Sequence, residues 1–223
     1  MDIQEGYILK RGLKILFLSL VLMSAGPVYA ERVKCVVGDC RNGWSVYEDA
    51  DGNRYKGDFR DGRMSGKGTF VWLAGDQYEG DFVDSIMTGV GVFSWANGDR
   101  YEGDFVDGSR TGKGSFTWTN GDRYEGDFVD GSRTGKGTFT WANGDRYEGD
   151  FVSGMRSGKG ELLWANGDRY EGDFVDDERT GSGVFVWANG DRYEGGFVDG
   201  LFLKDGSYIF KGRTPEGEDT EPF

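Results

Sequence analysis

Residues 95–106 read WANGDRYEGDFV, and the same twelve letters return at residues 141–152 and 164–175. Near-copies begin at Trp118 and Trp187. Tyrosine recurs every 23 residues from Tyr55 to Tyr193, and tryptophan keeps the same step from Trp72 onward. A short, regular period predicts a repeat array, in which each unit buries its apolar face against its neighbours. Each unit must then present the same surface on both sides, which explains the repeated phrase.

Within one unit the apolar residues alternate with polar ones. In YEGDF (residues 101–105) the aromatic residues and the glycine share one face, and the two carboxylates share the other. GSFTW (residues 114–118) alternates in the same way. A period of two is typical of β-strands, so each unit is expected to supply two short strands. The sequence therefore predicts an all-β fold, an elongated single-layer antiparallel sheet of tandem β-hairpins.

The turn residues suggest how the strands pair. Asn-Gly between Trp95 and Tyr101 is a hairpin signal, and we expect either a three-residue loop, residues 97–99, or a bulge. In this register Trp95 faces Tyr101 and Phe93 faces Gly103, so each phenylalanine ring lies over a glycine. The other connection, residues 106–113, is expected to be the longer loop.

Composition narrows the chemistry. The chain has 223 residues with 40 glycines, 15% aromatic residues and no histidine. Glycine is unfavourable inside helices, and without histidine the usual Ser-His-Asp and Cys-His catalytic pairs are excluded, as are most zinc sites. The carboxylates on the strands recur in about seven equal copies, whereas acid/base catalysis needs one pair with separated pKa values. We expect no enzymatic activity, no cofactor and no metal site, and we interpret GRMSGKG (residues 62–68) as a repeat loop without the spacing of a phosphate loop.

The N-terminus predicts export. Lys10, Arg11 and Lys14 precede the apolar residues 15–23, and small or neutral residues lead to Ala30. This order is typical of a secretory signal helix, residues 1–30, cleaved after Ala30, and implies a periplasmic, cell-envelope or extracellular protein. The alternative is an uncleaved membrane anchor, although the apolar run is well short of the ~20 residues that a spanning helix needs. Without residues 1–30 the net charge changes from −13 to −14, which disfavours nucleic-acid binding.

The remaining chain divides into three parts. Residues 31–54 form an N-terminal cap, in which Cys35 and Cys40 are expected to form a disulfide and residues 43–54 a degenerate half-unit. Residues 55–210 form the repeat array, closed by a strand in residues 205–210. Residues 211–223 are polar and acidic, and are expected to be a disordered tail.

The unit YEGDFVDGSRTGKGSFTWTNGDR (residues 101–123) resembles the MORN repeat, whose pattern is Y-x-G-x-F/W-x-x-G-x-x-x-G-x-G. The resemblance covers about residues 50–210, with departures at Ser85, Leu162, Asp177 and Gly196 that we expect to bend loops without erasing units. It implies a β-hairpin array that acts as a platform for protein interaction and assembly. Some members of the family are linked to membrane lipids, and some arrays precede a lipid-kinase domain, for which this chain offers no room.

The aromatic stripe is the candidate binding face. It either binds a protein partner, stacks on glycans or lipids, or packs within the array. Self-association through the sheet ends stays open. Of the basic residues in the repeats, Arg110, Lys113, Arg133 and Lys136 are interpreted as solvated loop charges and not as phosphate ligands. The candidate face consists of Trp95, Tyr101, Trp118, Tyr124, Trp141, Tyr147, Trp164 and Tyr170.

Overall fold

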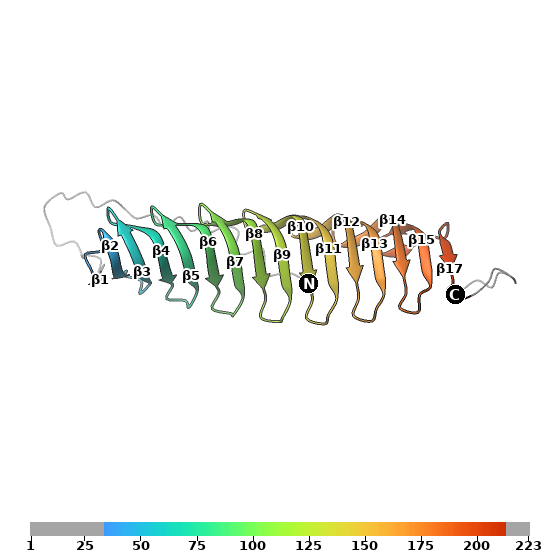
Figure 1. Ribbon diagram of the computed structural model, residues 1–223, viewed down its shortest axis with the longest axis horizontal. Coiled ribbons are helices and arrows are strands. Elements are labelled where there is room, and N and C mark those ends of the chain that lie inside the picture. Colours follow the sequence, from blue (N-terminus) through green and yellow to red (C-terminus); the bar gives the residue numbers. More distant parts are fainter. Residues whose placement is uncertain (1–33, 213–223) are drawn as a thin grey trace. The chain divides into compact units, whose positions relative to one another are not determined.

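The computed structural model describes residues 34–212, and every regular element in this range is a β-strand (Figure 1). The strands belong to one open antiparallel sheet of 17 strands, which confirms the predicted all-β hairpin array. The predicted signal helix lies outside the described residues, and so does most of the predicted tail. Within residues 34–212 no helix is long and apolar enough to cross a bilayer.

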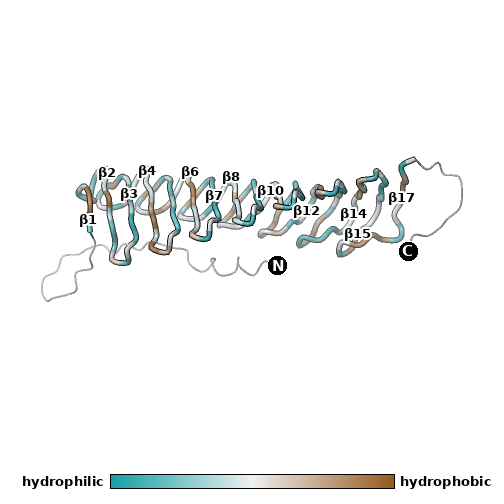
Figure 2. The backbone as a smooth tube through the Cα atoms, turned by 90° about the horizontal axis from the view of Figure 1, so that it is seen from below, coloured by the Kyte–Doolittle hydropathy of each residue, from teal (hydrophilic) through white to brown (hydrophobic). Residues whose placement is uncertain are grey.

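The chain separates into two compact units. The first ends at Ser132 and the second begins at Arg133. The strands of the first unit are β1 (Lys34–Val37), β2 (Gly43–Glu48), β3 (Arg54–Arg60), β4 (Arg63–Val71), β5 (Gln77–Val83), β6 (Ile86–Ser94), β7 (Arg100–Val106), β8 (Ser109–Thr117) and β9 (Arg123–Val129). The second unit contains all of β10 (Ser132–Thr140) except its first residue, followed by β11 (Arg146–Val152), β12 (Met155–Leu163), β13 (Arg169–Val175), β14 (Glu178–Val186), β15 (Arg192–Val198), β16 (Leu201–Phe202) and β17 (Ser207–Ile209). Figure 2 shows hydrophobic and hydrophilic residues alternating along the backbone of both units.

The shorter connection in each repeat is the Asp-Gly turn and not the Asn-Gly loop. Val106 pairs with Ser109, which leaves only Asp107 and Gly108 in the turn. Both turn residues have positive φ, 49° and 80°, as a type I′ hairpin requires. The predicted longer loop at residues 106–113 is therefore wrong: β8 begins at Ser109 and runs through most of that segment.

The Asn-Gly connection is a five-residue loop. Phe93 pairs with Tyr101, and the amide of Trp95 donates to the carbonyl of Asp99 at 2.9 Å. Within the loop, the Asp99 amide donates to Asn97 Oδ1 and Asn97 Nδ2 donates to Asp99 Oδ2, at 3.0 and 2.8 Å. These side chains close a wider loop than the dipeptide Asn-Gly alone suggests. The predicted three-residue loop and its register are wrong, and the bulge lies in the other hairpin, just after Gly103.

The observed register aligns glycines across the sheet. Gly91 pairs with Gly103, and Gly103 pairs with Gly114. A Cβ atom on Gly114 would lie 2.5 Å from Tyr101 Cε2, and one on Gly103 would lie 2.6 Å from the Tyr101 hydroxyl. Aromatic rings do lie over glycines, as expected, but the ring is that of tyrosine and not that of phenylalanine.

Hydrogen bonds from backbone amides join each repeat to the next at both ends of the strands. At the five-residue loops, the amide of Thr119 donates to Asp99 Oδ1 at 2.9 Å. At the tight turns, the amide of Gly108 donates to the carbonyl of Met87 at 2.9 Å. The aspartate that ends each NGD sequence is therefore an acceptor for the following repeat, which explains why it recurs.

Two tight turns replace glycine without changing the turn. Ser85 and Asp177 occupy the Gly108 position with φ of 67° and 71°, values that are unfavourable for non-glycine residues. Ser85 Oγ accepts a hydrogen bond from the Met64 amide at 3.0 Å, and Asp177 Oδ1 accepts one from the Arg156 amide at 2.9 Å. These bonds to the neighbouring repeat offset the backbone strain. The expected bending of these loops is absent, since each turn still has two residues.

The first and last strands differ from the hairpins between them. Cys35 and Cys40 form the predicted disulfide beside β1. β2, within the segment predicted as a half-unit, pairs with β3 so that Tyr47 faces Tyr55. β17, within the predicted closing strand, pairs with β15 so that Tyr208 faces Tyr193.

We predict that Gly114→Ala lowers the free energy of unfolding by roughly 1–3 kcal/mol, because the new methyl group overlaps the Tyr101 ring. Urea denaturation followed by tyrosine and tryptophan fluorescence measures the change. The matched control is Ser115→Ala, the next residue on the opposite face of β8. Equal midpoints for the two variants would show that the ring does not require glycine beneath it.

Candidate interaction surface

The deepest layer of the aromatic face is a ladder of tyrosine and phenylalanine rings. Tyr101 is completely buried and makes edge-to-face contacts with Phe105 of its own repeat and Phe128 of the next, at 5.2 and 5.1 Å between centroids. Its hydroxyl donates to the carbonyl of Asp104 at 3.0 Å. The same arrangement recurs around Tyr78 in the first unit and Tyr170 in the second. Edge-to-face geometry is favourable for aromatic pairs, so this ladder contributes to the stability of each unit.

Burial of the hydroxyl groups changes their acidity. It raises the pKa of Tyr101 and of Tyr170 to about 12. Burial also raises the pKa of the equivalent tyrosines Tyr55, Tyr78 and Tyr147 above the ordinary value. These groups are neutral structural donors at physiological pH.

A second ladder, of tryptophan and phenylalanine, lies closer to solvent. Trp95 contacts Phe93 and Phe116 at 4.5 and 5.1 Å between centroids, and Phe116 contacts Trp118 at 4.4 Å. The tryptophan rings remain partly exposed, unlike the tyrosines. In the second unit, the buried Leu162 occupies a phenylalanine position and interrupts the run of rings.

An arginine lies between the two ladders. Arg110 Nη2 donates to the carbonyl of Gly131 at 2.8 Å, and the amide of Gly131 donates to the carbonyl of Arg110 at 2.9 Å. Its guanidinium carbon lies 5.2–5.8 Å from four ring centroids, which is within cation–π range. These four rings belong to Trp95, Tyr101, Phe116 and Phe128.

The interpretation of Arg110 and Arg133 as solvated loop charges is therefore wrong. Arg133 repeats the arrangement, with Nη2 donating to the carbonyl of Gly154 at 2.7 Å. The equivalent Arg179 is held among rings as well, and burial lowers the pKa of its guanidinium. These arginines pair with the phenylalanine of YEGDF in the adjacent strand, as Arg110 does with Phe105. The sequence alone did not indicate this role, because the pairing depends on the strand register. In the first two repeats the position holds Met64 and Met87.

The opposite face of the sheet consists of paired charges. Glu102 binds Arg100 at 2.7 Å, and Asp127 binds Lys113 of the adjacent strand at 2.6 Å. Lys113 and Lys136 are exposed, as predicted, and each has an aspartate partner. Such exposed pairs contribute little individually. Among residues 34–212, no group of three or more acidic, cysteine or histidine residues is arranged to hold a metal ion.

The structure divides the predicted binding face into a buried and an accessible part. The tyrosines of the face, Tyr101, Tyr124, Tyr147 and Tyr170, are completely buried and cannot contact a ligand. The tryptophans are partly exposed, Trp95 and Trp118 in the first unit and Trp141 and Trp164 in the second. Within each unit, we call this tryptophan row, with the arginines beside it, the tryptophan–arginine surface. Its role in binding stays a prediction.

A protein-family model described as MORN repeat matches six consecutive segments: residues 55–77, 78–100, 101–123, 124–146, 147–169 and 170–192. This chain belongs to the MORN-repeat family. The match covers more than half of the sequence, and its boundaries coincide with the tyrosines that begin each hairpin. Each MORN repeat here is thus one tight hairpin followed by one five-residue loop.

Comparison with curated proteins finds no match to the chain. Among solved structures, the TCP domain of Drosophila melanogaster SAS-4 (dCPAP), in complex with a proline-rich motif of Ana2 (dSTIL), is 15% identical with a TM-score of 0.42. That match covers 86% of this chain and 99% of the TCP domain. The TCP10 domain of Danio rerio CPAP is 11% identical with a TM-score of 0.27, over 82% of this chain and 95% of that domain. Neither likeness informs the function of this MORN array.

We predict that the arginine position of a MORN repeat requires side-chain volume more than charge. Arg110→Ala empties the space between four rings and should lower the free energy of unfolding by about 1–3 kcal/mol. Arg110→Met should cost less, because Met64 and Met87 fill the same position in other repeats. Lys113→Ala is the matched control, since this side chain is 72% exposed. If Arg110→Ala and Lys113→Ala had the same denaturation midpoint, this would contradict the enclosed position of Arg110.

We predict that the fold loses stability at alkaline pH. The folded-state pKa of the ladder tyrosines is raised, so their contribution is complete below pH ~10 and is lost as the pH rises towards about 12. Absorbance at 295 nm should show tyrosinate forming together with loss of near-ultraviolet circular dichroism. Tyr208→Phe is the control, because Tyr208 is 45% exposed and lies outside the ladder of buried hydroxyls. Complete tyrosine ionisation near pH 10 with an intact fold would refute the assignment.

Proposed function

We propose that this protein is a non-enzymatic, exported scaffold that binds a protein partner through the tryptophan–arginine surface. The observation that supports the proposal is one recurring arrangement, a partly exposed tryptophan beside a half-buried arginine. It is found at Trp95 with Arg110 in the first unit, and at Trp141 with Arg156 and Trp164 with Arg179 in the second. Tryptophan, tyrosine and arginine carry much of the binding energy in protein interfaces. The rings and arginines are held by packing, so little conformational entropy is lost when a partner binds.

The symmetry of the repeats favours binding over catalysis. Glu102 and Asp127, like several of their equivalents, are engaged by neighbouring basic side chains. In Asp173, the hydrogen bond from Lys159 lowers the pKa of the carboxyl group. A general acid would need a raised pKa at one site and a normal one beside it. A row of similar ion pairs suits a structural face better.

Export is supported by two features. The N-terminal sequence has the order of a secretory signal, and the Cys35–Cys40 disulfide is typical of oxidising compartments. We propose cleavage after Ala30. Intact-mass spectrometry of the protein from its native cells tests this, and a chain that retains residues 1–30 would favour the membrane-anchored alternative.

A second candidate function is binding to a glycan or a membrane lipid surface. The partly exposed tryptophan rings favour this function, because indole suits both sugar faces and membrane interfaces. The net charge of −13 opposes attraction to anionic lipids. Co-sedimentation with liposomes and with envelope polysaccharides separates this candidate from a protein scaffold.

We predict that a photo-crosslinking phenylalanine derivative at Trp118 captures a partner protein in the native cells, and that the same group at Thr117 does not. Thr117 is the adjacent residue on the charged face, so it is a matched control for expression and folding. Mass spectrometry identifies the captured chain. Equal crosslinking at both positions, or lipid and glycan adducts alone, would refute protein binding through this surface.

A further inference from the structure

The charged face of the sheet carries a recurring ion pair between neighbouring repeats. In the second unit, Asp150 Oδ2 accepts a hydrogen bond from the Lys159 amide at 3.1 Å, and Asp150 Oδ1 binds Lys136 Nζ at 2.7 Å. Asp173 Oδ1 binds Lys159 Nζ in the same way, at 2.6 Å. One carboxylate oxygen thus closes the hairpin of its own repeat, while the other oxygen binds the lysine of the preceding repeat.

In the first unit, Val90 stands where this lysine would face Asp104. The register pairs Val90 with Asp104 as it pairs Lys113 with Asp127. Asp104 Oδ2 still accepts a hydrogen bond from the Lys113 amide, at 2.9 Å. Among residues 34–212, however, no lysine or arginine forms an ion pair with Asp104. Its charge is therefore not balanced by a basic side chain of the described strands.

Exposed apolar side chains lie beside this carboxylate. Val90 is 59% exposed, and Val106, which follows Asp104 by two residues on the same face of β7, is 52% exposed. Val90 and Val106 are diagonal neighbours across the strand pair, close enough for one ligand side chain to contact both. An apolar patch bordered by an unbalanced carboxylate suits a ligand group that is apolar and positively charged.

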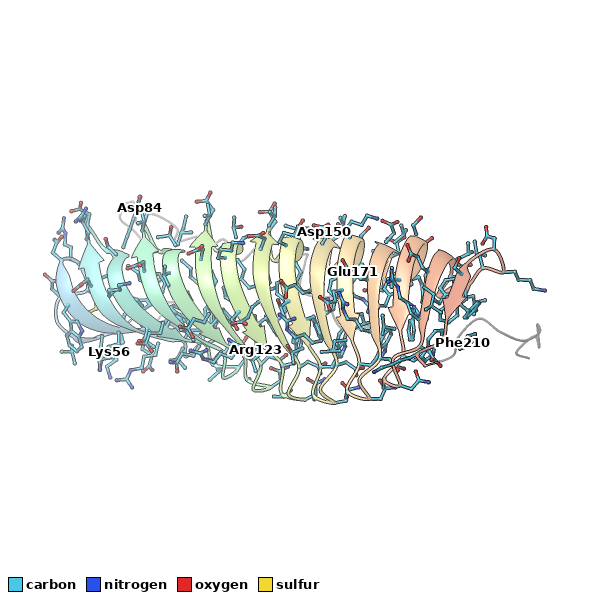
Figure 3. All side chains as sticks on the ribbon, turned by 45° about the vertical axis from the view of Figure 1, so that its right-hand side comes forward. Lys56, Asp84, Arg123, Asp150, Glu171 and Phe210 are labelled. Carbon is cyan, nitrogen blue, oxygen red and sulfur yellow. A yellow bond between two sulfur atoms is a disulfide. The ribbon has the colours of Figure 1, made fainter. Side chains whose placement is uncertain are left out.

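Strands β2 and β3 contain the same combination. Trp44 occupies the lysine position of β2 and pairs with Asp58 of β3. The tryptophan is 52% exposed, and Lys56 Nζ, whose residue is labelled in Figure 3, lies over its ring at 5.8 Å from the centroid. In the described part of the chain, Asp58 forms no ion pair either. Exposed tryptophan is a frequent anchor of protein interfaces.

We propose that this part of the charged face binds an extended segment of a partner protein in which lysine or arginine adjoins an apolar residue. We call it the Trp44–Val90 surface, and it consists of Trp44, Asp58, Val90, Asp104 and Val106. The basic group of the partner takes the position beside Asp104 that lysine holds beside the equivalent aspartates. The apolar side chain of the partner covers Val90 and Val106.

The spacing of the two apolar anchors fits one extended chain. Strands β2 to β6 are consecutive neighbours in the sheet, so Trp44 and Val90 are four strand spacings apart. This separation is roughly 19 Å, which about six extended residues span. A partner segment with two basic and apolar pairs at this interval therefore contacts both anchors.

Charge favours a basic protein segment over other ligands. The net charge of −13 attracts basic partners at long range. An anionic lipid headgroup is repelled by Asp104, and a neutral glycan has no charge to balance it. The surface lies on the face opposite the tryptophan–arginine surface, so neither proposal depends on the other.

Selection from a library of displayed random peptides, with the whole protein immobilised, tests the proposal. An excess of dissolved Val90→Lys protein removes peptides that bind elsewhere, because this variant restores the lysine that other repeats have. The peptides that remain should carry lysine or arginine next to an apolar residue. One such peptide, labelled with a fluorophore, then reports affinity by fluorescence anisotropy.

Two variants should weaken binding of the labelled peptide. Val90→Lys should lower the affinity by about tenfold, because the new lysine binds Asp104 and the apolar contact is lost. Asp104→Asn should lower it by about fivefold, since the amide oxygen still accepts from the Lys113 amide but carries no charge. Thr138→Lys is the matched control, because it adds the same charge to the charged face of the second unit, and it should bind like the wild type.

A double variant tests whether the arrangement itself is sufficient. Val90→Lys combined with Lys113→Val moves the valine and the unbalanced carboxylate by one repeat, to Asp127. It should regain affinity for a short peptide with a single basic and apolar pair. A selection that yields no peptide, or only peptides without lysine and arginine, would overturn the proposal, as would equal affinity of wild type and Val90→Lys. Liposome or polysaccharide binding that is lost in Val90→Lys, without peptide binding, would assign the surface to another ligand and also overturn it.

Discussion

The contact on which the rest of the structure depends is a tyrosine ring lying flat on two paired glycines. Tyr101 covers Gly103 and Gly114, and a Cβ atom on either glycine would overlap the ring. The ring is then held edge-to-face by Phe105 and by Phe128 of the next repeat. One repeat alone therefore cannot complete the environment of its own tyrosine. This constraint requires the same residues at the same spacing in every unit, which accounts for the near-identity of the repeated phrase.

The arginine between the ladders follows from the same dependence on a neighbour. Arg110 donates to the carbonyl of Gly131, which belongs to the turn of the following repeat. The position is not arginine in every repeat: methionine stands at residues 64 and 87, and Phe202 stands in the last repeat. Position 85 carries a serine whose hydroxyl accepts from the Met64 amide, so turn and core change together.

The sequence was sufficient for the repeat length, the all-β fold, the two faces and the disulfide, but not for the strand register. A three-residue and a five-residue loop both keep Tyr101 and Phe93 on the same face, so alternation cannot distinguish them. What decides between them is side-chain closure of the loop by Asn97 and Asp99, together with the volume beneath the Tyr101 ring. The incorrect register also prevented prediction of the role of Arg110, because the rings that it contacts lie on strands whose pairing depends on that register. The burial of the tyrosines could not be predicted from the sequence either. Periodicity indicates on which face of the sheet a residue lies, but not how deeply it is buried.

A repeat array that binds a specific partner must differ somewhere along its length, because identical units present identical sites. One such difference lies in the repeat at residues 78–100: Val90, 59% exposed, stands where Lys67 and Lys113 bind aspartates in other repeats. Asp104 faces Val90, and its carboxylate accepts from the Lys113 amide. The charged face is therefore interrupted by an apolar position in the first unit, while the ring core beneath it is unchanged. Uniform packing and local surface change are compatible because the two faces of one strand are chemically independent, and selectivity can evolve on one face while stability is maintained by the other.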